Sequence, residues 1–171
     1  MESWIIRTLI WGLFGVVMTA LYFWRPKPGR GVVGVFFAIM ALGVHGTNVL
    51  SDPQQYVTFA QGALIPVYRD LAVAVVSMSP AAFGLGMLVF EVVLAGLMLS
   101  HGTYARLGFV AAFLFLIGIM PLGPEELANV ILAVGVGYLA TREFPTSVIT
   151  DIRTWLRSRD LTSLGHGRAP A

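Results

Sequence analysis

The chain of 171 residues contains no cysteine. This absence excludes disulfide bonds, iron–sulfur clusters, thiolate-bound zinc and dithiol redox centres built from its own side chains. Charged residues are also scarce, since they make up 12% of the chain against roughly 25% in a typical soluble domain. The composition therefore argues against thiol chemistry and against a water-soluble globular protein.

Apolar residues dominate what is present, at 57% of the chain with a mean hydropathy of +0.80. Several nearly uncharged windows have about the 20 residues that cross a bilayer core. We therefore predict an all-α integral membrane protein, with a four-helix transmembrane bundle, an additional N-terminal transmembrane helix and a C-terminal amphipathic helix. The first three residues lack the basic charge of a signal peptide, so we expect the first helix to be retained. The expected spans are about 4–24, 31–50, 81–100, 105–120 and 126–141.

The segments between the spans differ in kind. Two prolines make RPKPGR (25–30) a predicted turn, and HGTYAR (101–106) is typical of a short loop. The stretch 51–80 is apolar but is interrupted by a proline and by the pair Arg69–Asp70. A partly buried, interfacial or re-entrant segment fits this stretch better than a full span.

Basic residues predict the orientation in the membrane. They gather in the first loop, in the loop near residue 106 and in the tail 142–171, whereas 51–80 has one arginine and 121–126 has none. We therefore expect a multi-pass plasma-membrane protein with its N-terminus outside and its C-terminus in the cytoplasm. A full span within 51–80 would reverse every later segment. The residues that set this orientation are Arg25, Lys27, Arg30, Arg106, Arg142, Arg153, Arg157, Arg159 and Arg168.

The tail has a helical pattern of its own. Its apolar residues recur at helical spacing on one face, and its charged residues lie away from that face. This pattern favours an amphipathic helix on the cytoplasmic membrane surface, where arginines meet anionic headgroups. A helix docked on the protein itself fits the pattern equally well. The apolar residues are Val148, Ile149, Ile152, Trp155 and Leu156, and residues 163–171 are expected to be disordered.

Three of the predicted spans carry a stripe of small or polar residues, the kind that brings membrane helices into close contact. Each stripe contains a polar residue inside the membrane, so we infer that Glu91, His45 and Asn129 lie near a shared interior. Counting residues from the helix ends places Glu91 roughly 8 Å deeper than His45, so their contact is left open. The stripes are Gly34, Ala38, Ala41, His45 and Asn48; Gly84, Leu88, Glu91 and Ala95; and Asn129, Ala133, Gly137 and Ala140.

Glu91 is the carboxylate within the apolar run MLVFEVVLAG (87–96). A charged residue at mid-membrane costs about 2.5–3.5 kcal/mol on the insertion scale, so Glu91 should face the interior. Three interpretations compete: a structural hydrogen bond to His45, Asn129 or a helix carbonyl; a pocket for a quinone-like or lipid headgroup; and a proton or ion relay. The candidate ligand or pocket residues are Glu91, His45, Asn48 and Asn129.

Other polar residues fit simpler roles. His45 is either a packing residue or a ligand contact, and haem is disfavoured because His101 lies at the opposite membrane face. Arg69 and Asp70 are expected to form an ion pair at the outer surface, with a gate over the bundle mouth as the minor alternative. The sequence indicates no metal site, no catalytic nucleophile paired with a base and no nucleic-acid partner.

Three motifs stand out within residues 30–141. An arginine opens the helix RGVVGVFFAIMALGVHGTNVL, which ends near a His-Gly pair; DPQQY precedes a segment with PVYRD; and PAAFGLGMLVFEVVLAGLMLSHGTYARLG has a central glutamate, a glycine turn and Arg-Leu-Gly. Together these motifs resemble the DoxX-like family. The resemblance implies a four-helix membrane bundle with its N-terminus inside, to which the first helix and the tail are additions. Asn48 lies where many members carry a lysine.

The resemblance also bears on function, because some relatives are subunits of thiosulfate:quinone oxidoreductases and others associate with thiol and oxidative-stress enzymes. Without cysteine, redox chemistry here would need a partner subunit or a bound quinone. We therefore expect a small accessory subunit of a membrane protein complex, redox- or quinone-linked, that contacts membrane lipids and other subunits. The alternative is a carrier or channel for a small hydrophobic or protonated solute, and an enzyme acting on a lipid or quinone ranks third.

Overall fold

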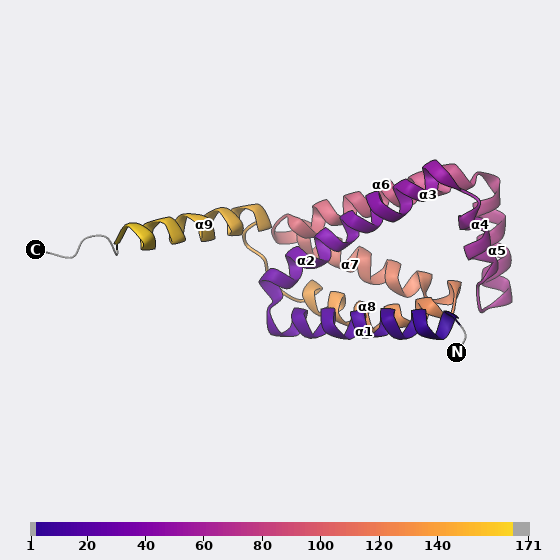
Figure 1. Ribbon diagram of the computed structural model, residues 1–171, viewed down its shortest axis with the longest axis horizontal. Coiled ribbons are helices and arrows are strands. Elements are labelled where there is room, and N and C mark those ends of the chain that lie inside the picture. The colour runs from indigo at the N-terminus through magenta and orange to yellow at the C-terminus, as the bar shows by residue number, and fades with distance from the viewer. Residues whose placement is uncertain (1–2, 166–171) are drawn as a thin grey trace, which may run out of the picture.

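The computed structural model describes residues 3–165, which form helices and contain no strand (Figure 1). Most of the long helices run back and forth along one long axis, and α1 begins at the end of the bundle opposite the C-terminal helix. The helices are α1 (Ser3–Trp24), α2 (Pro26–Ile39), α3 (Gly46–Ser51), α4 (Gln55–Gln61), α5 (Pro66–Met78), α6 (Pro80–Leu99), α7 (Gly102–Ile119), α8 (Asn129–Ala140) and α9 (Val148–Gly165). Shorter turns are η1 (Met40–His45), η2 (Met120–Leu122) and η3 (Glu125–Ala128).

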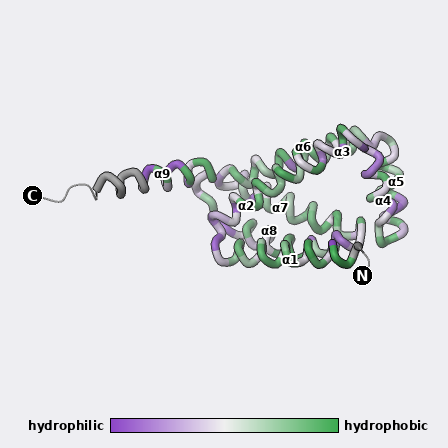
Figure 2. The backbone as a smooth tube through the Cα atoms, in the orientation of Figure 1, coloured by the Kyte–Doolittle hydropathy of each residue, from purple (hydrophilic) through white to green (hydrophobic). Residues whose placement is uncertain are grey.

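Four segments are long and apolar enough to cross a membrane: Ile5–Trp24, Pro26–Ser51, Pro80–Leu99 and Gly102–Leu122. These helices are hydrophobic over most of their length (Figure 2), and many of their large apolar side chains are exposed, such as Leu9 and Leu13 at more than 60%. Such a surface is unfavourable in water and suits contact with lipid chains. The prediction of a helical protein with helices long and apolar enough to span a membrane is thus confirmed for the described residues. The fifth predicted span, 126–141, is not among these four segments, because α8 has only 12 residues.

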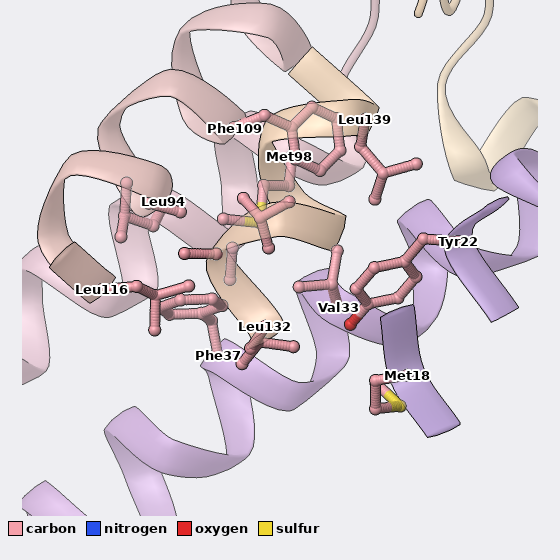
Figure 3. Close-up of a cluster of buried hydrophobic side chains, with 14 of the residues drawn as sticks. Met18, Tyr22, Val33, Phe37, Leu94, Met98, Phe109, Leu116, Leu132 and Leu139 are labelled. Atoms are coloured by element: carbon pink, nitrogen blue, oxygen red, sulfur yellow. The ribbon is translucent and has the colours of Figure 1, made fainter. Parts of the chain in front are cut away.

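The core lies where α2, α6, α7 and α8 meet. Phe37 from α2, Met98 from α6 and Phe109 from α7 are 2% exposed or less and pack with Leu132 and Leu139 of α8 (Figure 3). Close approach is provided by small residues, because a Cβ on Gly108 would lie 2.9 Å from the backbone nitrogen of Met98. The small-residue pattern therefore serves helix packing, as expected in a membrane bundle.

The second helix begins earlier than the sequence indicates. The two prolines of RPKPGR predict a turn, but α2 starts at Pro26 and the connection to α1 is reduced to Arg25. Proline suits the first helical turn because its missing N–H would have no helical partner there. The loop before α7 is also shorter than expected: α7 starts at Gly102, whose φ of +57° reverses the chain directly after α6.

One wide turn interrupts the second helix. Met40–His45 forms a π-helical turn, in which the N–H of Gly46 bonds to the carbonyl of Ala41, five residues earlier. The helix continues through α3 without a break in direction. Such turns insert an extra residue into a helix and rotate the later residues about its axis. This turn ends at His45, one of the predicted pocket residues.

The stretch 51–80 forms two short helices, α4 and α5, that lie across one end of the bundle (Figure 1). Neither is among the segments that qualify as spans. Two hydrogen bonds fasten the pair to the end of α7: Leu64 N–H donates to Pro121 at 2.8 Å, and the Tyr68 hydroxyl donates to Gly118. After α4 and α5 the chain therefore enters α6 at the same end of the bundle where α3 finishes. The basic residues 25, 27, 30, 106 and 142 lie at the opposite end.

The C-terminal helix projects away from the bundle (Figure 1). Its first turn is held by Arg30, whose guanidinium lies 2.8 Å from the Asp151 carboxylate. Docking of the whole apolar face on the bundle is wrong, because only Val148 at its start is partly buried and the rest is half exposed or more: Ile149 60%, Ile152 52%, Trp155 53% and Leu156 50%. The expected disorder from residue 163 is also wrong as far as Gly165, where α9 ends, and residues 166–171 lie outside the described part.

Candidate functional site

A cavity of about 840 Å³ opens at the end of the bundle that carries α4 and α5. Side chains from α1, α2, α4, α5, α6, α7 and η3 line it, so that chain segments far apart in sequence share one space. Its walls are mainly apolar and rich in aromatic rings, among them Trp11, Phe36, Phe83 and Phe115. Apolar cavities of this size with few polar groups are typical of small-molecule sites.

One polar part of the wall is built by three residues from three helical segments. His45 ends the π-helical turn, Glu91 lies in the middle of α6, and Tyr56 lies in α4. His45 Nε2 is 3.5 Å from Glu91 Oε2, and His45 Nδ1 is 2.8 Å from the Tyr56 hydroxyl. When Tyr56 donates to Nδ1, the imidazole proton is on Nε2 and faces Glu91. The structure thus joins two predicted pocket residues whose contact the sequence leaves open.

Glu91 is buried but only partly satisfied. The residue is 3% exposed, and its Oε2 atom has no hydrogen-bond partner among the described residues. The 3.5 Å approach of His45 is an ion-pair distance without hydrogen-bond geometry. A buried polar atom without a partner is costly, and such atoms are typical of functional positions. Glu91 also lines the cavity, so its carboxylate belongs to the wall that a bound molecule would meet.

Tyr56 is a site residue that the sequence does not reveal. It lies in DPQQY, where nothing in the pattern distinguishes an inward-facing tyrosine from a surface one. In the structure it is 6% exposed and its ring stacks on His45 at 5.7 Å between centroids. Burial, and to a lesser degree the nearby Glu91 charge, raises the pKa of the Tyr56 hydroxyl. Tyr56 therefore remains a neutral hydrogen-bonding group at physiological pH.

Asn48 and Asn129 also line the cavity, in agreement with the stripe pattern. Asn129 does not join the His45–Glu91 pair, because its amide donates to the Glu126 carboxylate on the preceding turn. Helix α8 makes its main backbone contacts with α1 and α7 rather than with α2 and α6, so its stripe does not lie against the other two. Burial is the main factor that raises the pKa of Glu126; the Asn129 hydrogen bond opposes this shift and Glu125 adds to it.

A second polar edge of the cavity is absent from the sequence prediction. Arg7 of α1 and Glu125 of η3 form an ion pair at 3.0 Å, and both line the cavity beside Glu126. The hydrophobic run around Arg7 hides its role, since the partner lies more than 100 positions later in the chain. The cavity thus has one polar edge at His45–Glu91 and another at Arg7–Glu125.

The Arg69–Asp70 ion pair forms as expected, with 3.7 Å between Arg69 Nε and Asp70 Oδ1. Both side chains point to the exterior, at 45% and 78% exposure, and neither lines the cavity. On this side the cavity is lined by apolar side chains of α5, namely Ala72, Val75 and Val76. Such an exposed pair contributes little to stability.

Within the described residues no group of three or more His, Cys, Asp or Glu side chains is arranged to hold a metal ion. The arrangement offers binding: an apolar volume, a buried carboxylate oxygen, an imidazole and a phenol. Comparisons with models of protein families, with curated proteins and with solved structures find no match to this chain. The described residues thus form a helical protein with four helices long and apolar enough to cross a membrane and with a mainly apolar cavity at one end of the bundle.

Proposed function

We propose that this protein binds a small, mainly hydrophobic molecule with one polar end, and that it does so as an accessory subunit of a membrane protein complex. The single observation that carries the proposal is the cavity of about 840 Å³ with the unpartnered Glu91 oxygen in its wall. Apolar walls remove the body of the molecule from lipid or water, and the few polar groups orient its end. A quinone or a lipid is the ligand class that the family resemblance would imply.

The subunit role is supported by two surfaces that lie outside the cavity. Large apolar side chains are exposed on α9 and on the outer face of α1, for example Trp155 at 53% and Leu13 at 66%. Apolar surface of this extent is typical of contact with lipid or with other subunits. The five-span topology, the outside N-terminus and the cytoplasmic C-terminus belong to the same proposal, in which α8 completes the bundle as its fifth spanning helix.

The ligand proposal is tested by thermal shift on the purified full chain with a panel of short-chain quinones and lipids. A ligand that binds only the folded state stabilises it by about 2.7 kcal/mol at a hundred times its Kd. Ala72→Phe puts a ring into the cavity, and Ala74→Phe, on the exposed side of the same helix, is the matched control. A compound should stabilise wild type and Ala74→Phe but not Ala72→Phe. Equal shifts in all three proteins would contradict the proposal.

Transport is the second candidate function, favoured by the presence of two titratable side chains, Glu91 and His45, in contact within the cavity. A carrier would move a small hydrophobic or protonated solute across liposomes, and Glu91→Gln would abolish the pH dependence of that flux. A binding subunit would retain its ligand without flux. Proteoliposome uptake therefore separates the two functions.

A further inference from the structure

The charges that line the cavity are predominantly negative. Three carboxylates line it, Glu91, Glu125 and Glu126. Against them stand one guanidinium, Arg7, which is already paired with Glu125, and one imidazole, His45, which lies 3.5 Å from Glu91. Glu126 receives one amide hydrogen bond from Asn129, and an amide carries no net charge. The cavity thus has more negative than positive groups before any ligand enters.

A second and independent observation points to the ligand itself. Glu91 lines the cavity and is 3% exposed, and its Oε2 atom lacks a hydrogen-bond partner among the described residues, with His45 Nε2 at an ion-pair distance of 3.5 Å. A carboxylate oxygen can only accept hydrogen bonds and attract positive charge. The molecule that satisfies it must bring a donor or a cationic centre.

The remaining wall favours the cationic choice. Aromatic side chains from α1, α2, α4, α6 and α7 surround the space, and the faces of aromatic rings attract cations. Desolvated sites that combine rings with carboxylates are those that recognise organic ammonium groups. The rings are Trp11, Phe36, Phe37, Tyr56, Phe83 and Phe115.

We infer that the ligand of this cavity is a lipophilic organic cation, such as an amine or onium ion with apolar substituents, whose positive centre lies against Glu91. This inference rests on the proposed binding function and specifies its ligand class. The apolar substituents occupy the aromatic walls, and the cation completes the environment of the unpartnered oxygen. An anion of the same shape is repelled by the carboxylates.

The test uses tetraphenylphosphonium and tetraphenylborate, which have the same shape and opposite charge, with the full chain in lipid nanodiscs and empty nanodiscs as background. Wild type should bind the phosphonium above background and exclude the borate. Glu91→Gln should bind the phosphonium about tenfold more weakly, which corresponds to about 1.4 kcal/mol. Asp70→Asn removes an exposed carboxylate outside the cavity and should leave binding unchanged.

The outcomes separate this inference from the function on which it rests. Equal binding of both ions to wild type, or unchanged phosphonium binding in Glu91→Gln, would overturn the cation class. If the neutral probe decylubiquinone still binds wild type and is excluded by Ala72→Phe, the proposed binding function stands even though the cation class is overturned. If none of the three probes binds above background, both are overturned. The comparison of the two ions on wild type needs no variant, so a Glu91→Gln protein that fails to fold does not remove the test.

Discussion

His45 Nε2 lies 3.5 Å from Glu91 Oε2, although the two residues belong to helices that run in opposite directions and are 46 positions apart. The register of the two helices explains the contact. Gly34 lies opposite Leu99, and Gly46 opposite Leu88, so the middle of α6 lies beside the π-helical turn. The side chains then need to bridge only a few ångströms along the helix axis.

The Tyr56 hydroxyl should contribute to the stability of this pair. Tyr56→Phe removes the partner of His45 Nδ1 and should lower the free energy of unfolding by about 0.5–1.5 kcal/mol. In a double-mutant cycle with His45→Phe, the two changes should be non-additive, because the residues are in contact. Tyr68→Phe, which loses a bond to Gly118 instead, is the control and should be additive with His45→Phe. Additivity in both cycles would contradict the contact.

Gly84 should be intolerant of a side chain. A Cβ there would meet the Tyr56 ring and lie 2.6 Å from Val49 Cγ2, whereas a Cβ on Gly86 meets nothing within 4 Å. Gly84→Ala should therefore destabilise by about 1–3 kcal/mol through overpacking. Gly86→Ala should stabilise by roughly 0.5–1 kcal/mol, because alanine is the better helix former. Melting temperatures in detergent compare the two, and equal effects would mean that α4 does not pack on α6 at this position.

Arg30 should be the most sensitive residue at the opposite end of the bundle. It is 1% exposed, donates to the carbonyls of Ser100 and Thr146, and pairs with Asp151. Arg30→Met should destabilise by about 3–5 kcal/mol, as removing one partner of a buried ion pair does. Asp151→Asn should cost less, since Asp151 is 37% exposed.

The contact between Arg30 and the first turn of α9 can also be tested by limited proteolysis. Because Arg30 holds the first turn of α9, its loss should expose the segment 145–158 to protease before the bundle unfolds. Arg153→Met, on the exposed part of α9, is the matched control. Identical digestion patterns for wild type and Arg30→Met would show that the contact does not fasten α9.

Glu126 should make stability depend on pH. Burial raises its pKa in the folded protein, so the folded state binds this proton more tightly than the unfolded chain. The stabilisation is therefore present below the ordinary pKa of glutamate and is lost as the pH rises through the raised value. Glu126→Gln keeps an acceptor for Asn129 and removes this dependence, so its melting temperature should exceed that of wild type more at pH 8 than at pH 5. Glu143→Gln, at an exposed position, is the control, and an equal gain at both pH values would contradict the prediction.

Much of the helical layout can be predicted from hydrophobic length alone. The long apolar runs predict α1, α6 and α7 to within a few residues of their observed ends, because a single apolar run of this length satisfies its own backbone in lipid by forming a helix. The ends themselves are less predictable, since Pro26 and Gly102 are typical turn residues but each begins a helix. Whether such a residue forms a turn or begins a helix depends on its position relative to the preceding helix and not on its identity.

Only some residues of the candidate site can be predicted from the sequence. His45, Asn48 and Glu91 carry a signal, because polar residues in apolar runs are costly unless they face the interior. Tyr56 and Glu125 carry none, since they lie in short segments where polar and aromatic residues are ordinary. Their roles depend on how α4 and η3 pack against distant helices, and periodicity within one segment does not contain that information.

Native mass spectrometry of the full chain, released from lipid nanodiscs, would show whether the cavity holds a ligand. We expect wild type and Ala74→Phe to carry one hydrophobic small molecule per chain and Ala72→Phe, with its cavity filled, to carry none. If all three proteins are bare, or all three carry the same bound mass, the cavity beside Glu91 and His45 is not a ligand site.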